Sequence, residues 1–261
     1  MSEKKTVILV VSVGTNIIRA KAAAYDKIVE DLAQYSSLPV WQAFTDDDTA
    51  AARTGSTAND KIYTVEGALE TAIAQKFTDV KVIPVFMARG ELYFTLQERL
   101  EFYKDRLNIR VADPVLANEE ACEEVANLFI QMTDIDPNKE YLLVSHGNPK
   151  FPFMGYKILE QKLQEKGYAN IKVISLMERD SFGQAVTFLK KRNALERNEN
   201  VVIIPLIVAW GDYMADELYN SQDSFIWQLR RAGYRAVFTG MGLGEFELFR
   251  TIYNKRLDAI L

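Results

Sequence analysis

The 261-residue sequence has one cysteine and one histidine. The single cysteine, Cys122, excludes an internal disulfide and a metal cluster built on several thiolates. The single histidine, His146, lies in the stretch YLLVSHGNP (141–149), so any chemistry that needs an imidazole depends on that stretch. The sequence also lacks an apolar run of the roughly 20 residues that cross a bilayer. A membrane-spanning segment is therefore not expected.

Positive charge is scarce as well. Lysine and arginine number 31 against 36 aspartates and glutamates, which gives a net charge of −5 at pH 7. No dense basic patch appears, so a nucleic-acid partner is not expected. The apolar stretch near the N-terminus is short and β-branched and leads into Gly-Thr-Asn, which indicates a buried strand rather than a signal peptide. These features predict a cytoplasmic protein.

Apolar runs of strand length alternate with segments of helical periodicity along the whole chain. Strands are expected at 6–12, 40–44, 80–86, 109–112, 141–145, 171–176, 201–208 and 236–239. Helices are expected at 16–35, 65–75, 91–107, 119–132, 157–165, 181–191, 225–232 and 245–259. Because the expected strands are apolar throughout, both faces of a parallel sheet would be covered by helices. The pattern predicts an α/β fold.

An internal repeat divides the sequence. The stretch LVVSVGTN (9–16) resembles LLVSHGNP (142–149), and VIPVFMARGEL (82–92) resembles IIPLIVAWGDY (203–213). Two copies of one α/β unit predict two similar lobes, residues 1–137 and 138–261, with the last helix able to pack back on the first lobe. Ligands bind at the carboxyl edges of parallel sheets, so a cleft between these edges is expected to hold the site.

Two candidate residues follow neighbouring strands of the second lobe. The imidazole of His146 could accept a proton or bind a metal, or it could be a strand-end side chain that is hydrogen-bonded to a nearby turn. Glu178 follows the next strand, so its carboxylate could meet His146 and share a divalent cation. It could equally be an acid favoured at a helix N-terminus, with Asp180 as the cap.

Asp212 and Tyr213 follow the strand expected at 201–208. A tyrosine there could stack on a flat ligand or coordinate a metal as phenolate, although its ordinary pKa near 10 makes the phenolate costly without a metal. Packing at the rim is the alternative. The repeat pairs Asp212 with Glu91 and Tyr213 with Leu92. Polar chemistry is thus expected mainly in the second lobe.

The glycines of GMGLGE (240–245) do not have the spacing of a dinucleotide-binding loop. They predict a tight turn that brings the backbone close to the site.

Several short motifs occur together and in order. They are SVGT (12–15), AFT (43–45), the His146-Gly147 turn, Glu178, PLIVAWGDY (205–213), the DS pair (223–224) and GLGE (242–245). This set resembles the anaerobic cobalt chelatases, the CbiK-type sirohydrochlorin cobaltochelatases of the class II chelatase superfamily. The resemblance covers nearly the whole chain. It implies a chelatase-like fold of two Rossmann-like or flavodoxin-like lobes, and insertion of a divalent metal into sirohydrochlorin, an acidic tetrapyrrole, during cobalamin biosynthesis.

The resemblance also implies roles for particular residues. His146 would act as a base together with Glu91, and His146, Glu178 and Tyr213 would bind the metal, with Co²⁺ expected first and Fe²⁺ or Ni²⁺ as other candidates. The family has a second histidine at the position of Tyr213 and a glutamate at the position of Leu92. Contacts with the tetrapyrrole are implied for Ser12, Gly14, Thr15, Arg89, Leu92 and Asp212.

One alternative stays open. A homologue with this fold could bind haem or another tetrapyrrole without inserting a metal, with His146 or Tyr213 as the axial ligand. Homo-oligomerisation is also left open by the sequence.

Overall fold

The computed structural model describes residues 4–46, 62–148, 154–197 and 200–261, and for Ile62, Asp212 and Tyr213 it describes the backbone alone. The chain divides into two compact units, Met1–Val115 with Arg250–Leu261 (unit 1) and Leu116–Phe249 (unit 2). The boundary expected between residues 137 and 138 falls inside unit 2. Among the described helices, none combines the length and apolarity that crossing a bilayer requires.

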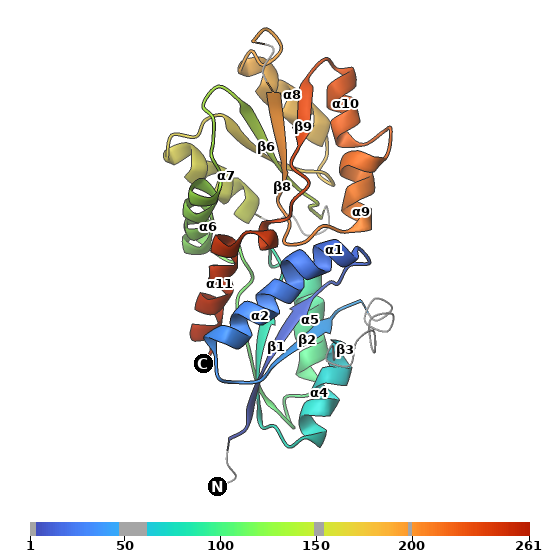
Figure 1. Ribbon diagram of the computed structural model, residues 1–261, viewed down its shortest axis with the longest axis vertical. Coiled ribbons are helices and arrows are strands. Elements are labelled where there is room, and N and C mark those ends of the chain that lie inside the picture. Colours follow the sequence, from blue (N-terminus) through green and yellow to red (C-terminus); the bar gives the residue numbers. More distant parts are fainter. Residues whose placement is uncertain (1–3, 47–61, 149–153, 198–199) are drawn as a thin grey trace. The chain divides into compact units, whose positions relative to one another are not determined.

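Within the described residues, unit 1 contains a five-stranded parallel sheet of order β3-β2-β1-β4-β5 (Figure 1). Its strands are β1 (Thr6–Ser12), β2 (Val40–Phe44), β3 (Ile62–Thr64), β4 (Asp79–Pro84) and β5 (Asn108–Val111). Its helical segments are α1 (Ile18–Ala20), the π-helix η1 (Lys21–Tyr25), α2 (Asp26–Tyr35), α4 (Val65–Ala74), α5 (Glu91–Glu101) and most of α11 (Glu247–Asp258).

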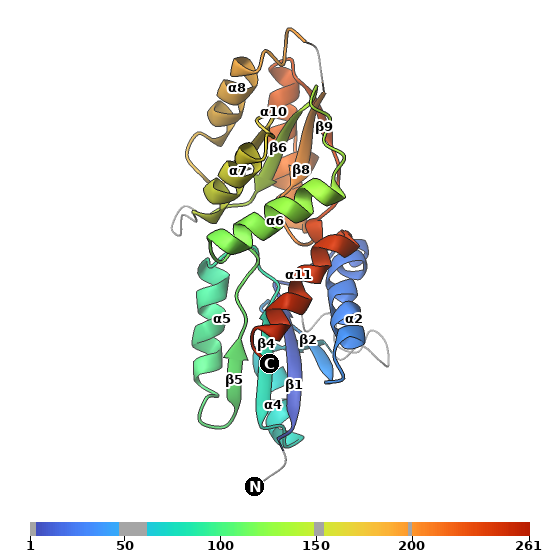
Figure 2. The ribbon, with the colours of Figure 1, turned by 90° about the vertical axis from the view of Figure 1, so that its left-hand side faces the viewer.

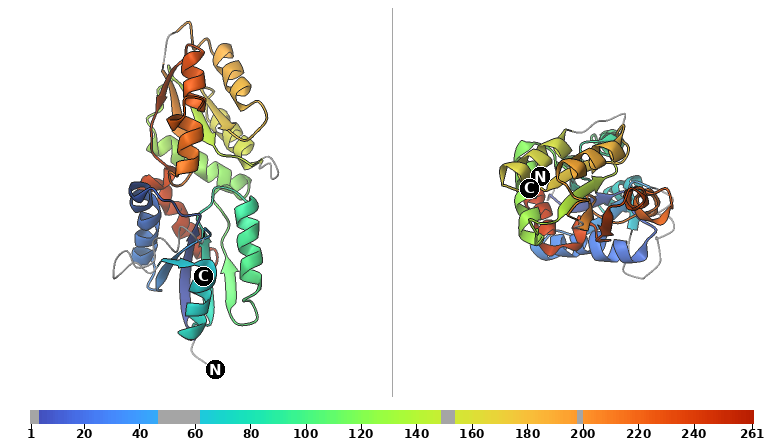
Figure 3. Two further views of the ribbon diagram at one scale, coloured as in Figure 1. Left: turned by 90° about the vertical axis from the view of Figure 1, so that its right-hand side faces the viewer. Right: turned by 90° about the horizontal axis from the view of Figure 1, so that it is seen from above.

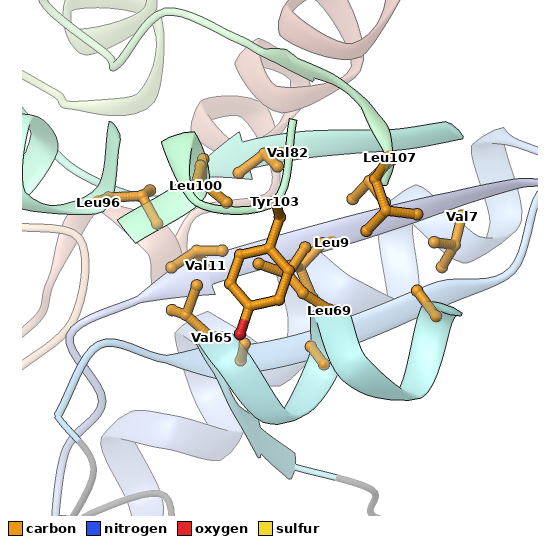
Figure 4. Close-up of a cluster of buried hydrophobic side chains, with 14 of the residues drawn as sticks. Val7, Leu9, Val11, Val65, Leu69, Val82, Leu96, Leu100, Tyr103 and Leu107 are labelled. Carbon is orange, nitrogen blue, oxygen red and sulfur yellow. The ribbon is translucent and has the colours of Figure 1, made fainter. Parts of the chain in front are cut away.

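Side-chain alternation along β1 builds the two faces of this sheet. Val7, Leu9 and Val11 point to one face, where they pack against α4 and α5 in a cluster of buried residues (Figure 4). The residues between them are buried on the opposite face, which α2 and α11 cover (Figure 2). An ion pair joins these two helices, with Arg250 Nε 2.6 Å from Asp31 Oδ2.

In the described part of unit 2, a four-stranded parallel sheet has the order β7-β6-β8-β9. The strands are β6 (Glu140–Ser145), β7 (Ile171–Ser175), β8 (Asn200–Pro205) and β9 (Arg235–Phe238). The helical segments are α6 (Glu119–Met132), α7 (Gly155–Glu165), α8 (Ser181–Lys191), α9 (Asp212–Ala215), the π-helix η2 (Asp216–Asn220), α10 (Phe225–Arg231) and the 3-10 helix η3 (Leu243–Glu245). Helices α8 and α10 contact each other and contribute to one core cluster (Figure 3), whereas α6 packs against α7.

The register of the two sheets confirms the internal duplication. Strands β2-β1-β4-β5 and β7-β6-β8-β9 have the same order and direction. Val11 lies opposite Pro84 in unit 1, and Val144 lies opposite Pro205 in unit 2, as the sequence repeat predicts. Two helices follow a strand of one unit and belong to the other: α6 follows β5, and α11 follows β9. The predicted α/β fold with parallel sheets is confirmed.

Some elements differ from the expectation. Strand β3 has three residues, too few for an alternating pattern to be recognised. The helix expected at 16–35 begins at Ile18 and contains a π-helical segment. Helix α9 and η2, over residues 212–220, were not predicted, because this short segment mixes apolar and acidic residues and ends in asparagine.

Glu140, at the start of β6, is a charged residue in the core of unit 2. Its side chain is fully buried, and its carboxylate accepts hydrogen bonds from Arg192 Nε, at 3.1 Å, and from Arg197. A buried carboxylate is tolerated only where such partners replace its hydration. The two arginines therefore hold this end of the central strand.

Candidate functional site

His146 directly follows the carboxyl end of β6, and hydrogen bonds to the neighbouring strand hold the chain at this point. Ser145, the last residue of β6, is fully buried and lies opposite Ser175 of β7. The two hydroxyl oxygens are 2.9 Å apart, within hydrogen-bonding distance. Beyond the strands, the backbone N–H of Met177 donates to the carbonyl of His146 at 2.9 Å. The backbone of His146 is thus fixed by the neighbouring strand.

Gly147 makes the turn after His146 possible. Its φ of +77° lies in the left-handed region, which side chains other than glycine rarely adopt. A Cβ atom at this position would lie 2.9 Å from Cβ of Ser175, closer than van der Waals contact allows. Gly14 occupies the same position after β1, with a φ of +91°. Both copies of the repeat therefore use glycine for one local conformation.

The imidazole of His146 is held by its own turn. Its Nδ1 atom lies 2.7 Å from the carbonyl oxygen of Gly147. A carbonyl oxygen only accepts, so Nδ1 carries the hydrogen and a neutral ring presents a lone pair at Nε2. Nε2 lies 3.8 Å from Oε2 of Glu217. The two side chains are 39% and 30% exposed, but the facing atoms Nε2 and Oε2 are themselves shielded from solvent.

Sequence reasoning missed Glu217, because the segment that carries it was not predicted to be helical. Glu217 belongs to η2, whose Leu218 is fully buried in the core of unit 2. The apolar spacing of Met214, Ala215 and Leu218 is a helical signal that could have found this segment. Single π-turns within helices are frequent at functional sites.

Glu178 lies in the turn between β7 and α8, where its backbone N–H donates to the carbonyl of Ser175 at 3.1 Å. Burial raises the pKa of Tyr156 to about 12; a hydrogen bond with Ser145 opposes this shift, and the negative charge of Glu178 adds to it. Glu178, Tyr156 and Ser145 are therefore neighbours. The expected sharing of a metal by Glu178 and His146 stays a prediction.

Asp212 and Tyr213 are the first two residues of α9, directly after Gly211. Their side chains lie outside the described part of the structure, so the metal role of Tyr213 and the substrate role of Asp212 stay predictions. Among the described residues, no group of three or more histidine, cysteine, aspartate or glutamate side chains could hold a metal ion.

Aromatic rings gather at the carboxyl ends of β8 and β9. The ring centroids of Trp210 and Phe238 are 5.0 Å apart, and Tyr219 stacks on Phe238 at 5.3 Å with an interplanar angle of 22°. The guanidinium of Arg230 lies 5.0 Å from the ring centroid of Trp227. The rings of Trp210, Phe238 and Tyr219 place flat apolar surface at this end of the sheet, whereas Arg230, on α10, donates to the carbonyl of Ala236 within β9.

The tight turn expected at 240–245 is confirmed. A Cβ atom on Gly242 would lie 2.6 Å from the carbonyl oxygen of Val208, so the chain passes too close to the loop after β8 for any side chain there. The N–H groups of Leu243 and Gly244 donate to the carbonyls of Ile207 and Val208, each at 2.8 Å. This turn fixes the loop that leads from β8 to α9.

The candidate residues of unit 1 lie at the carboxyl edge of its own sheet. Ser12 ends β1 and is buried, with no hydrogen-bond partner for its Oγ in the described part of the chain. Gly14 and Thr15 follow, and Thr15 Oγ1 accepts from the backbone N–H of Ile17 at 3.1 Å. These residues form one turn.

A second group of unit 1 candidates follows β4. Arg89 forms an ion pair with Asp113, and both side chains are over 40% exposed. Glu91 is the first residue of α5, and Leu92 after it is 46% exposed. Helices α5 and α9 thus begin at equivalent points, which agrees with the pairing of Leu92 with Tyr213. The catalytic and substrate roles assigned to these residues stay predictions.

The chain has two parallel sheets with the same strand order, and its fold is that of chelatases of known structure. SirB from Bacillus subtilis with Fe³⁺ superposes with a TM-score of 0.67, at 15% identity over 97% of this chain and 94% of SirB. DR2241 from Deinococcus radiodurans, a multi-domain protein with structural similarity to chelatases, gives a TM-score of 0.60, at 14% identity over 98% of this chain and 55% of DR2241. At these sequence identities, the two structural similarities support a shared fold and no statement about function.

The profile of the cobalt chelatase (CbiK) family matches residues 6–261, and the chain belongs to this family. The resemblance seen in the sequence motifs is thereby confirmed. The family places the protein among the tetrapyrrole metal chelatases. No curated protein sequence matches the chain.

Proposed function

We propose that the protein inserts Co²⁺ into sirohydrochlorin or a closely related tetrapyrrole, as a lyase of cobalamin biosynthesis. The observation that carries this proposal is the geometry of His146. Its ring is fixed through Nδ1 to the carbonyl of Gly147, which holds the imidazole at the carboxyl edge of the sheet. Open parallel sheets place their ligands at this edge.

Metal insertion exchanges one divalent ion for the two pyrrole N–H protons of the macrocycle. An imidazole nitrogen is suited to accept such a proton, and Nδ1 of His146 is already engaged with the carbonyl of Gly147. We assign this step to His146, whose Nε2 takes a proton after the metal has passed from it to the macrocycle. Glu91, in the first turn of α5, is proposed as a second proton acceptor.

The metal enters as a substrate and must be held briefly before transfer. His146, Glu178 and Tyr213 are proposed to hold it, in line with the positions of the family motif. One nitrogen and oxygen donors suit borderline ions such as Co²⁺, Fe²⁺ and Ni²⁺. This set binds cobalt more weakly than one with two imidazoles, which favours release to the macrocycle.

The tetrapyrrole is flat and acidic, and the proposed contacts follow from this chemistry. The turn that contains Ser12, Gly14 and Thr15 offers backbone and hydroxyl groups, and Arg89 offers a cation for a carboxylate. Leu92 offers exposed apolar surface, and Asp212 is the remaining candidate contact.

An anaerobic assay of metal insertion tests the proposal. Sirohydrochlorin is mixed with Co²⁺, Ni²⁺ or Fe²⁺, and absorbance reports the metal complex. His146→Ala should lower the rate 10²- to 10⁴-fold, the range expected for removal of a general base. Gln161→Ala, on the exposed side of α7, is the control and should keep the rate of the parent protein. Tight haem binding with no insertion of any metal would instead favour a haem-binding homologue.

A further inference from the structure

Large apolar side chains follow three of the strands of unit 2 at the carboxyl edge of the sheet. Met177 follows β7 and is 36% exposed, and Met241 follows β9 and is 38% exposed. Trp210 follows β8 and is half-buried, so part of its side chain is accessible. His146 follows β6, which pairs with both β7 and β8. This edge therefore combines the imidazole with accessible apolar surface.

Aromatic neighbours hold the indole ring of Trp210. Its centroid lies 5.0 Å from that of Phe238, the last residue of β9, with 43° between the ring planes. Phe238 is stacked in turn on Tyr219, with the ring centroids 5.3 Å apart. Trp210 and Phe238 both pack against the buried core of unit 2. The indole is therefore held beside the carboxyl ends of β8 and β9.

The backbone before Trp210 is held as well. The turn at 240–245 donates two hydrogen bonds, each of 2.8 Å, to the carbonyls of Ile207 and Val208. Because both the loop and the ring are already ordered, binding of a ligand against Trp210 costs little further conformational entropy.

A tetrapyrrole that reaches His146 also extends over the ends of neighbouring strands, because the strands of one sheet lie only about 4.7–4.9 Å apart. Strand β8 lies beside β6, and the loop after it carries Trp210. An indole offers a large flat apolar face, and stacked rings attract each other beyond the burial of their area. Such a face distinguishes a flat macrocycle from a bent one, whereas charged side chains do not.

We propose that Trp210 is a specificity-determining residue, which stacks on the face of the bound tetrapyrrole and favours macrocycles that are flat. This inference rests on the proposed function and adds to it the feature of the substrate that unit 2 recognises. A porphyrinogen is the reduced form of such a macrocycle, in which saturated bridges between the pyrroles prevent a flat ring. It can carry the same kind of acidic side chains, so it presents the charge of the substrate without its shape.

The test compares the binding of two metal-free macrocycles to the full-length protein under anaerobic conditions. Isothermal titration calorimetry gives the Kd of sirohydrochlorin and the Kd of uroporphyrinogen. Trp210→Leu keeps an apolar side chain and removes the ring. It should raise the Kd of sirohydrochlorin about 3- to 10-fold, as expected for the loss of one ring stack, and leave the Kd of uroporphyrinogen unchanged. Trp210→Phe keeps a ring and should recover most of the affinity for sirohydrochlorin.

Trp227→Leu is the matched control. Trp227 is also a partly exposed tryptophan, but it lies on α10, where its ring faces the guanidinium of Arg230 at 5.0 Å. Its replacement should change neither Kd. An unchanged Kd of sirohydrochlorin in Trp210→Leu would overturn the proposal. So would an equal rise for both macrocycles, which a general loss of structure would produce.

The ratio of the two Kd values separates recognition from stability. Partial unfolding removes competent protein for both macrocycles alike, so it changes both apparent Kd values and leaves their ratio the same. Urea unfolding followed by circular dichroism identifies a variant that does not fold. Trp210→Met, whose flexible side chain adapts to the available space, then takes the place of Trp210→Leu.

Binding of the macrocycle and insertion of the metal are measured separately, so the two proposals fail separately. Ring-dependent binding of sirohydrochlorin without insertion of any metal would leave the role of Trp210 standing and remove the chelatase reaction. Metal insertion with a Kd that is indifferent to Trp210 would do the reverse. A parent protein that binds neither macrocycle would overturn both.

Discussion

Replacing Gly147 by alanine should damage both the stability of unit 2 and the position of His146. Two costs follow from the structure. Alanine in the left-handed region costs about 1–2 kcal/mol, and the native φ here is +77°. The new Cβ would lie 2.9 Å from Cβ of Ser175, so Ser175 or the turn must shift. Loss of the hydrogen bond between Ser175 and Ser145 adds about 1 kcal/mol.

Together these costs predict a loss of about 2–3 kcal/mol in the free energy of unfolding of unit 2. Urea unfolding followed by circular dichroism measures it. The turn also carries the carbonyl that holds Nδ1 of His146, so we expect metal insertion by Gly147→Ala to fall at least tenfold even when the variant is folded.

Gly167→Ala is a control with the same backbone conformation and free space around it. Gly167 has a φ of +94°, and a Cβ added there would meet no atom within 4 Å. Gly167→Ala should lose only the about 1–2 kcal/mol of unfolding free energy that the left-handed backbone conformation costs alanine, and it should keep the rate of metal insertion. Equal losses of stability in the two variants, or full insertion activity in Gly147→Ala, would refute the reasoning about the contact with Ser175.

Three further outcomes are expected. Glu140→Gln should lower the free energy of unfolding of unit 2 by about 1–3 kcal/mol, measured in urea at pH 7, because the fully buried side chain loses its charged hydrogen bonds. The loss stays in this range because the arginine partners are partly exposed and remain hydrated. The hydrogen bonds from Arg99 lower the pKa of Glu66 in the folded state. This pair therefore stabilises unit 1 at a pH above the unfolded carboxyl pKa of about 4.3, and the stabilisation is lost as the pH falls through the folded pKa. Thermal melts of Glu66→Gln should accordingly lose less stability than the parent protein between pH 5 and pH 3. Burial raises the pKa of Cys122 to about 11, so a thiol reagent at pH 7.5 should modify it at least 100-fold more slowly in the folded protein than in urea, and equal rates would contradict its burial.

Much of the fold could be predicted from the sequence because its signals are local. Buried parallel strands are apolar on both faces, and helices repeat their apolar residues every three or four positions. These patterns located the elements around β1, β4, β6 and β8. The repeat around Pro84 and Pro205 predicted that the two sheets would share their order, which the register confirms.

The candidate site was predictable only in part. A polar residue and a glycine after an apolar strand mark a ligand-binding edge, which is why His146 and Gly147 stood out in the sequence. Glu217 did not stand out, because nothing in the local sequence distinguishes it from other acidic residues in helices. Its relevance depends on a distance of 3.8 Å to a residue on a different strand–helix connection.

The sequence by itself determined the α/β alternation, the duplication and the place of the lone imidazole, since each depends on residues close together in the chain. Only the tertiary structure decided that α6 belongs to unit 2 and that Oε2 of Glu217 lies 3.8 Å from Nε2 of His146. It also showed why Gly147 cannot carry a side chain, because the obstacle is Ser175 on the neighbouring strand. Such contacts arise from the path of the whole chain, and a local pattern of residues does not encode that path.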